Sequence, residues 1–238
     1  RFSYGTKQKL TANGFTKVGE TFVGWALTPT GSVMYGDEAE VADLCTDNDD
    51  TITLYAVWQK TVTKISFVSD GGTVNAPTSV GYGEQLSADG LVVPTRGGYK
   101  FAGYYTQADG AGDMIFDGEM NVAYTGAWDK NVVTLTLYAA WTPVSYTVVY
   151  VNGQDEIARQ TAVYGVEFDL RLATDENGLG IVVPAGYTFV GWSTVPGAQT
   201  VMFADGQKIV SGLTENDGDE VRLYAVYIKG DTLQAQID

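Results

Sequence analysis

Two short acidic runs contain side chains that could bind a metal ion. Residues 46–51 read "TDNDDT" and residues 214–220 read "TENDGDE". Their carboxylates are those of Asp47, Asp49, Asp50, Asp217, Asp219 and Glu220. Carboxylate oxygens on short loops are ligands that calcium prefers, but neither run has the spacing of an EF-hand loop. Calcium binding is therefore one hypothesis for these runs, and a polar hairpin turn without a metal is the other.

A second candidate site is aromatic and occurs in triplicate. The pattern Gly-x-x-Phe-x-Gly-aromatic is written as "GETFVGW", "GYKFAGY" and "GYTFVGW" at residues 19–25, 98–104 and 186–192. If their last residues are exposed, Trp25, Tyr104 and Trp192 could stack on a ligand such as a sugar ring. The alternative is a β-strand that packs in the same way in three copies of one module.

The strand interpretation accounts for every feature of this motif, and we prefer it. It predicts that Phe22, Phe101 and Phe189 are core centres. Strict alternation places Phe189 and Trp192 on opposite faces of the strand, with the Trp or Tyr half-buried as a lid. The glycine before it leaves room for a close neighbour, for which we expect the Tyr of a later Leu-Tyr-Ala motif.

Catalysis is not expected of this chain. It has 238 residues, no histidine and one cysteine, Cys45. The lack of histidine excludes Ser-His-Asp and Cys-His nucleophilic systems and nearly all catalytic zinc sites. An enzyme would have to rely on paired carboxylates alone, as glycoside hydrolases do. Because the carboxylates gather in turns, we expect a non-enzyme without a cofactor, with calcium as the one ion left open.

Charge and hydropathy narrow the class of partner. The net charge of −15 repels nucleic acid and anionic lipid. No apolar stretch approaches the roughly 18 to 20 residues of a membrane span, so we expect no membrane insertion. Short runs rich in Val, Thr and Tyr, separated by many of the 29 glycines, are typical of β-structure with frequent turns.

The chain contains three internal repeats. Three landmarks recur in the same order: Tyr-Gly, the aromatic motif and Leu-Tyr-Ala. Tyr-Gly stands at 4–5, 82–83 and 164–165, and Leu-Tyr-Ala at 54–56, 137–139 and 223–225. The period exceeds the about 20 to 50 residues of solenoid repeats and suits small autonomous domains. We expect repeat one at 1–59, repeat two at 60–142, repeat three at 143–228 and a tail or linker at 229–238.

The repeats differ at their beginnings. Repeats two and three open with an alternating strand and a glycine turn, "KISFVSDGGTV" at 64–74 and "YTVVYVNGQ" at 146–154. Repeat one starts at its second strand and lacks the first. Weak helical character is expected at 84–97, and 166–178 is the best helix candidate. The tail could instead form an added edge strand.

The order of these motifs resembles the Listeria–Bacteroides repeat, the B-repeat type of module found in internalin-like bacterial surface proteins. Departures are Tyr104 and Tyr227 in place of Trp, and Glu20 in place of Tyr. The resemblance implies tandem β-grasp-like modules of mainly β or α+β class, each with a mixed sheet and a short helical crossover. It also implies an extracellular location on the cell surface, with cell-wall attachment through regions outside this chain.

The function that we expect is a non-catalytic stalk or spacer on a Gram-positive cell, which projects other domains and aids adhesion. Its partners would then be neighbouring repeats or domains of the same chain. The alternative is an adhesin that recognises a host glycan or matrix protein through half-exposed aromatics, with calcium as an accessory ion. A carboxylate-only hydrolase is the remaining rival.

Overall fold

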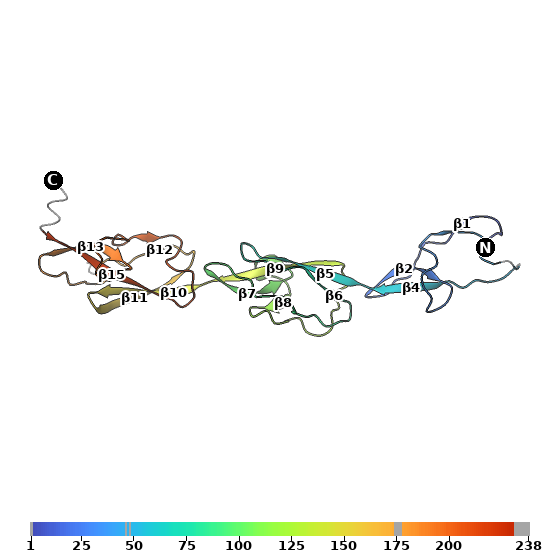
Figure 1. Ribbon diagram of the computed structural model, residues 1–238, viewed down its shortest axis with the longest axis horizontal. Coiled ribbons are helices and arrows are strands. Elements are labelled where there is room, and N and C mark those ends of the chain that lie inside the picture. Colours follow the sequence, from blue (N-terminus) through green and yellow to red (C-terminus); the bar gives the residue numbers. More distant parts are fainter. Residues whose placement is uncertain (1, 46, 48, 174–177, 231–238) are drawn as a thin grey trace. The chain divides into compact units, whose positions relative to one another are not determined.

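Strands make up almost all the regular structure of this protein. The computed structural model describes residues 2–45, 47, 49–173 and 178–230 (Figure 1). Within them the named helical element is one 3-10 turn, η1 (Ala108–Gly110). The strands form several separate sheets rather than one. The predicted mainly β class is confirmed.

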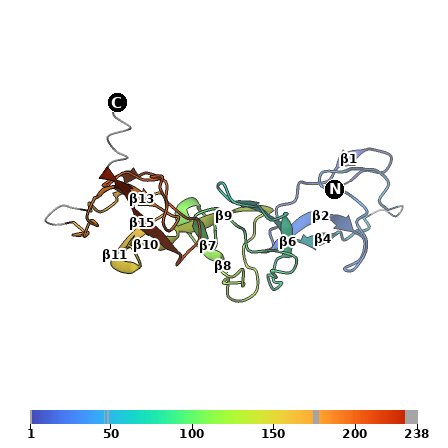
Figure 2. The ribbon, with the colours of Figure 1, turned by 60° about the vertical axis from the view of Figure 1, so that its left-hand side comes forward.

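Repeat three contains a four-stranded mixed sheet. Its strands are β10 (Ser145–Asn152), β11 (Asp155–Val163), β13 (Tyr187–Ser193) and β15 (Glu220–Lys229). Their order is β11-β10-β15-β13, and β10 runs parallel to β15 while the other pairs are antiparallel. The first and last strands of the repeat are thus neighbours, as both views of the ribbon show (Figures 1 and 2).

Repeat two has the same plan with one additional strand. Its strands are β5 (Val62–Val68), β6 (Thr78–Gly81), β7 (Tyr99–Tyr105), β8 (Met114–Asp117) and β9 (Thr134–Pro143). The order is β6-β5-β9-β7-β8, with β5 parallel to β9. The mixed sheet that the family resemblance implied is therefore present in repeats two and three.

Repeat one is less complete. It pairs β2 (Glu20–Ala26) with β4 (Tyr55–Lys60) in an antiparallel two-stranded sheet. A second small sheet of repeat one pairs β1 (Gln8–Lys9) with β3 (Glu40–Val41). Repeat three has a similar small sheet, in which β12 (Phe168–Asp169) pairs with β14 (Lys208–Ile209). In the part of repeat one that the structure describes, no strand lies on the other side of β4, where β5 and β10 stand in the later repeats.

The aromatic motif is a strand with a β-bulge. Phe189 pairs with Tyr227, but Gly191 pairs with Val226, so Val190 is an extra residue in β13. The same shift occurs in β2 between Phe22 and Gly24. A bulge reverses the alternation of side chains beyond it. The expected placement on opposite faces is therefore wrong: the Phe189 and Trp192 rings meet edge to face with centroids 5.2 Å apart.

The bulge also changes which residues are core centres. Phe22, Phe101 and Phe189 are only half-buried, whereas Tyr104 and Trp192 are 0% exposed. In repeat three the core surrounds Trp192, Tyr150 and Leu223, all fully buried. The predicted core centres are thus wrong by three positions along the motif, because the bulge turns the following aromatic inward.

The glycine beside the bulge leaves room for the backbone and a valine side chain (Val33 or Val201) of the segment that follows the motif strand, not for an aromatic ring. A Cβ added at Gly24 would lie 2.6 Å from the carbonyl oxygen of Tyr35, and one added at Gly191 would lie 2.6 Å from that of Phe203. Both neighbours belong to the short segment that follows the motif strand and bridges back to it. The expected neighbour, the Tyr of Leu-Tyr-Ala, is therefore wrong.

Consecutive repeats are joined without a loop. β4 ends at Lys60 and β5 begins at Val62, so Thr61 alone separates them. β9 ends at Pro143 and β10 begins at Ser145, with Val144 between them. The closing strands of repeats one and two thus lead directly into the first strand of the following repeat.

The compact units of the chain do not follow the repeats. One unit comprises the described residues within 1–68, 74–92 and 104–138, and the other those within 69–73, 93–103 and 139–238. The first unit contains the connection at Thr61, and the second contains the one at Val144. The division at 59 and 142, and the autonomy of each repeat, remain predictions.

Neither expected helix is present in the described residues. Residues 84–97 form turns and irregular structure. The other candidate, 166–178, contains the two-residue strand β12 instead, and its residues 174–177 lie outside the described part. Among described residues there is thus no helical crossover, and the β-grasp detail of the predicted fold stays a prediction. Residues 231–238 of the predicted tail also lie outside the described part.

Candidate functional site

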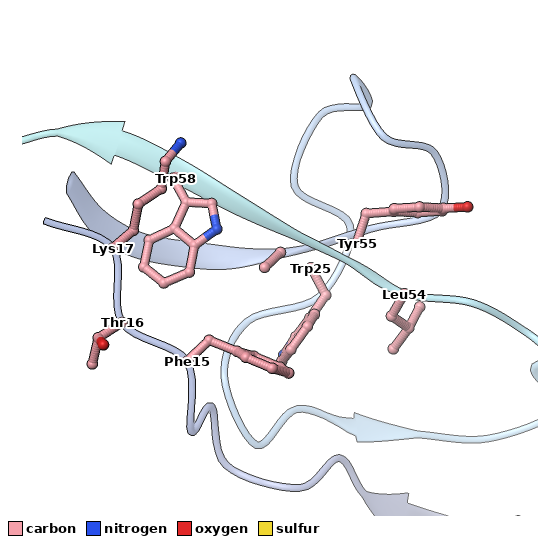
Figure 3. Close-up of a pocket in the computed structure, with 8 residues that line it drawn as sticks. Phe15, Thr16, Lys17, Trp25, Leu54, Tyr55 and Trp58 are labelled. Atoms are coloured by element: carbon pink, nitrogen blue, oxygen red, sulfur yellow. The ribbon is translucent and has the colours of Figure 1, made fainter.

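A pocket lies beside Trp25 in repeat one. Its volume is about 380 Å³, and its walls are mostly apolar (Figure 3). It lies between the segment that precedes β2 and the start of β4. The residues that line it are Phe15, Thr16, Lys17, Trp25, Leu54, Tyr55, Ala56 and Trp58. Phe15 and Trp25 face one another edge to face, with ring centroids 6.3 Å apart.

The counterparts of Trp25 are covered by a ring from the first strand of their repeats. In repeat two, Phe67 of β5 packs on Tyr104 with centroids 4.7 Å apart. In repeat three, Tyr150 of β10 packs on Trp192 at 5.1 Å. Trp25 keeps intermediate exposure, whereas Tyr104 and Trp192 are 0% exposed. The pocket is thus the space that a first-strand aromatic fills in the other two repeats.

These burials decide which predicted stacking residues could meet a ligand. The expectation that Tyr104 and Trp192 lie half-exposed is wrong, because both rings belong to the core and present no face to solvent. Trp25 alone has the intermediate exposure that was expected of all three. A ligand site displayed in triplicate is therefore not what the motif forms.

The indole nitrogen of Trp25 is buried without a hydrogen-bond partner. Its counterpart, Nε1 of Trp192, donates to Asp205 at 3.4 Å. The residue that corresponds to Asp205 is Asp37, whose carboxylate instead accepts hydrogen bonds from the backbone of Asn13 at 2.8 Å and Glu38 at 3.1 Å. A buried unsatisfied donor costs about 1 to 3 kcal/mol.

In repeats two and three, the aromatic residue that follows Leu-Tyr-Ala in the closing strand donates a hydrogen bond to the end of the first strand. Trp141 Nε1 donates to the carbonyl oxygen of Ser69 at 2.9 Å, directly after β5. The Tyr227 hydroxyl donates to Oδ1 of Asn152 at 2.8 Å, the last residue of β10. Trp58 holds this position in repeat one and lines the Trp25 pocket.

The acidic run of repeat three uses its carboxylates in separate interactions. Asp217 accepts from Lys100 Nζ at 2.6 Å and from the backbone N–H of Ser145 at 3.1 Å. The hydrogen bond from Lys100, and then that from Ser145, holds the pKa of Asp217 below its usual value. Glu220 pairs with Arg159 and Arg222.

Asp219 is engaged within its own loop. Its carboxylate accepts from the Thr214 hydroxyl at 2.7 Å and from Asn216 Nδ2 at 3.0 Å. These two hydrogen bonds lower the pKa of Asp219. Asp47, Asp49 and Asp50 in repeat one are exposed, and residues 46 and 48 lie outside the described part. In the described ranges no three acidic, His or Cys side chains gather as a metal site would require. Calcium binding stays a prediction.

The junctions between repeats carry a contact that sequence reasoning missed. Gly98, with φ +76°, lies against the ring of Tyr164, so closely that any Cβ at residue 98 would overlap the ring. Gly19, with φ +73°, meets Tyr82 in the same way. These residues are the first glycine of the aromatic motif and the Tyr of the next repeat's Tyr-Gly. Both motifs recur in the sequence, but neither one indicates that they pack on each other.

Backbone hydrogen bonds at the junctions repeat as well. The single residue between closing and first strands donates to the motif glycine: Thr61 to Gly19 and Val144 to Gly98, each at 2.9 Å. The junction tyrosine then donates back, Tyr82 to Thr61 and Tyr164 to Val144, each at 2.9 Å. Each junction therefore combines a glycine–ring contact with two backbone hydrogen bonds.

Comparison with known proteins gives a family match. The model of the Listeria-Bacteroides repeat domain family matches residues 1–57 and 64–140. Two proteins of Evansella cellulosilytica, named "Putative Gly-rich membrane protein" and "Putative membrane protein", are each 28% identical over 181 residues, or 74% of this chain. The chain spans 18% and 23% of their lengths. In the part that the structure describes, no helix has both the length and the hydropathy for a membrane crossing.

Proposed function

Because this chain belongs to the Listeria–Bacteroides repeat family, we propose that it is a non-catalytic spacer on the bacterial cell surface. It holds other domains of a longer protein away from the envelope and is attached through regions outside these residues. Both relatives are named as membrane proteins, which supports a surface location.

The observation that carries this proposal is the junction between repeats. A spacer must hold its modules at a set separation, and a flexible linker of several residues would not do so. Here Val144 alone separates β9 from β10, and Gly98 packs on Tyr164. The Lys100–Asp217 ion pair adds a polar contact across the same junction. The contacts at Gly19 and Tyr82 repeat this design.

Pulsed electron spin resonance on two nitroxide labels tests the stiffness that a spacer needs. The exposed Val93 and Val195 are replaced by cysteine and labelled, with Cys45 replaced by serine. The labels then lie in repeats two and three of one compact unit. We expect one narrow distance distribution, which broadens in a Tyr164→Ala background. An equally broad distribution in both proteins would refute a spacer with fixed junctions.

The pocket beside Trp25 favours one second candidate function, the ligand-binding adhesin. It is apolar and has a half-exposed indole in its wall, as sugar-binding sites often do. A screen of the whole chain against glycans, mucins and matrix proteins, with and without calcium, tests it. Specific binding that a Trp25→Phe variant loses would favour the adhesin. A lack of binding above background would leave the spacer alone.

A further inference from the structure

The open edge of β4 differs from the same edge in the other repeats. β9 and β15 each run for 10 residues, whereas β4 has 6. The missing part corresponds to residues 51–54, which form no regular structure. In repeats two and three the equivalent residues pair with β5 and β10 in parallel. The first part of the closing strand therefore forms only where a parallel neighbour is present.

Apolar side chains along this edge of β4 are more exposed than their counterparts in the other two repeats. Leu137 pairs with Phe67 and Leu223 pairs with Tyr150, and both leucines are 0% exposed. Leu54, in the same position, has intermediate exposure and lines the pocket. Two residues earlier, Ile52 is 38% exposed. The leucine of the closing strand is thus fully buried in repeats two and three and only partly covered in repeat one, where the exposed Ile52 extends the apolar edge.

We propose that the β4 edge and the Trp25 pocket together bind an extended peptide segment of the β5 and β10 type, running parallel to β4. The segment adds a strand to the sheet by main-chain hydrogen bonds. The side chains at every second position of this segment face the pocket, so these side chains determine which segment binds.

Three features of that segment follow from β5 and β10. An aromatic residue stands opposite Leu54 and fills the pocket against Trp25, as Phe67 and Tyr150 do in their repeats. A β-branched apolar residue precedes it by two positions, like the fully buried Ile65 and Val148. A hydrogen-bond acceptor follows it by two positions and meets Trp58, as Ser69 meets Trp141 and Asn152 meets Tyr227.

The main-chain contacts can be placed from the ladder of repeats two and three. Lys64 donates to the carbonyl oxygen of Val133, and Thr147 donates to that of Asp219, each at 2.9 Å. The equivalent acceptor in repeat one is Asp50. In a parallel ladder the groups that face one neighbour alternate along the strand. The N–H of Ile52 therefore faces the incoming segment, and that of Thr53 faces the other way.

The test uses the full chain and a synthetic peptide with the sequence of residues 63–71, which carries the β5 pattern around Phe67. Control peptides are the same sequence with Phe67→Ser and a scrambled sequence. Fluorescence anisotropy of the labelled peptide gives the affinity. Incorporated 5-fluorotryptophan gives five ¹⁹F signals, one for each tryptophan, and a Trp25→Phe variant assigns Trp25.

We expect saturable 1:1 binding that weakens about tenfold or more for the Phe67→Ser peptide, the size of one lost aromatic contact. The Trp25 and Trp58 signals shift on binding, while those of Trp141 and Trp192 stay. An Ile52→Pro chain loses binding because it lacks the edge donor. A Thr53→Pro chain, with the same substitution one residue on, retains it.

Other outcomes overturn the proposal. Equal affinity for the Phe67→Ser or scrambled peptide would mean that the pocket does not recognise the aromatic residue or the sequence of the segment. Unchanged binding by the Ile52→Pro chain would place the peptide elsewhere. Occupation of the pocket by free indole or a sugar, with no peptide binding at millimolar concentration, would make it a small-ligand site. Self-association that the peptide does not displace would assign the edge to a second copy.

Discussion

The ring of Tyr164 in one repeat packs against Gly98 of the preceding repeat, where no side chain could fit. Its ring also meets that of Tyr99 edge to face, with centroids 5.7 Å apart. Residue 98 has a left-handed conformation, which glycine adopts without strain. Two independent constraints, backbone and space, therefore require glycine at the junction. They make the contact testable by a single methyl group.

Gly98→Ala is expected to destabilise the protein more than Gly186→Ala does. Both glycines have positive φ, at +76° and +82°, so both variants carry the left-handed strain of about 1 to 2 kcal/mol. Only at residue 98 does the new methyl group meet a ring, which adds about 1 to 3 kcal/mol. Urea unfolding of the two variants gives the comparison. Equal losses would mean that the Tyr164 contact has no energetic weight.

Trp192→Ala should cost about 3 to 5 kcal/mol of unfolding free energy, because the ring is fully buried in the core of repeat three. Phe189→Ala should cost less, since Phe189 is only half-buried. Trp25→Ala, the matched position in repeat one, should also cost less than Trp192→Ala. Chemical denaturation of the three variants measures this order. A larger loss for Phe189→Ala than for Trp192→Ala would mean that Phe189, and not Trp192, is the core centre of the motif.

The Lys100–Asp217 pair should make the junction sensitive to acid. The pKa of Asp217 is lowered in the folded protein, so its stabilising effect is present above the ordinary value of 3.8 and is lost as pH falls through the folded value. Asp217→Asn should therefore differ from the wild type at neutral pH and converge with it in acid. Unfolding curves from pH 2 to pH 7 would show this, and Lys100→Met should raise the pKa in a carboxyl NMR titration. Parallel pH profiles for wild type and Asp217→Asn would contradict the assignment.

A fragment of residues 143–230 should fold on its own. The core of repeat three, around Trp192, Tyr150 and Leu223, is built from residues of that repeat alone. Losing the junction removes the Gly98 contact but no residue of that core cluster. Dispersed amide NMR signals and a cooperative unfolding transition are the expected results. A fragment without either would show that the repeat depends on its neighbour.

Calcium removal should leave the stability of repeat three unchanged. Asp217, Asp219 and Glu220 already have separate protein partners, which a shared cation would have to displace. Thermal unfolding of the whole chain, in which Asp217 keeps its Lys100 partner, is compared in EDTA and in excess calcium, with magnesium as the control for ionic strength. A calcium-specific rise in the melting temperature would support the calcium hypothesis for the acidic run.

Much of the architecture could be predicted from the sequence, because recurring motifs report a recurring fold. The β class, the family and the missing first strand of repeat one all follow from Tyr-Gly, the aromatic motif and Leu-Tyr-Ala. The side-chain directions did not follow. Alternation is a local rule, and a bulge at Val190 breaks it without a clear mark in the sequence other than the adjacent glycine.

The junction contact and the Trp25 pocket could not be predicted from local sequence patterns, for a different reason. Gly98 and Tyr164 are far apart in the sequence, and nothing in either motif says that one packs on the other. In the described residues no strand covers Trp25 on the far side of β4, whereas the same five letters, TFVGW, give the buried Trp192 in repeat three. Such differences arise from tertiary neighbours, which composition and periodicity do not encode.

The parallel pairing of β10 with β15 has a mechanical consequence. A pull on the two ends of repeat three acts on adjacent strands in opposite directions along their length, so their hydrogen bonds resist together in shear and do not open one at a time. β5 and β9 form the same clamp in repeat two. The described part of repeat one has no such clamp. A strand added parallel to β4 would give repeat one the same shear geometry and raise the force that it withstands.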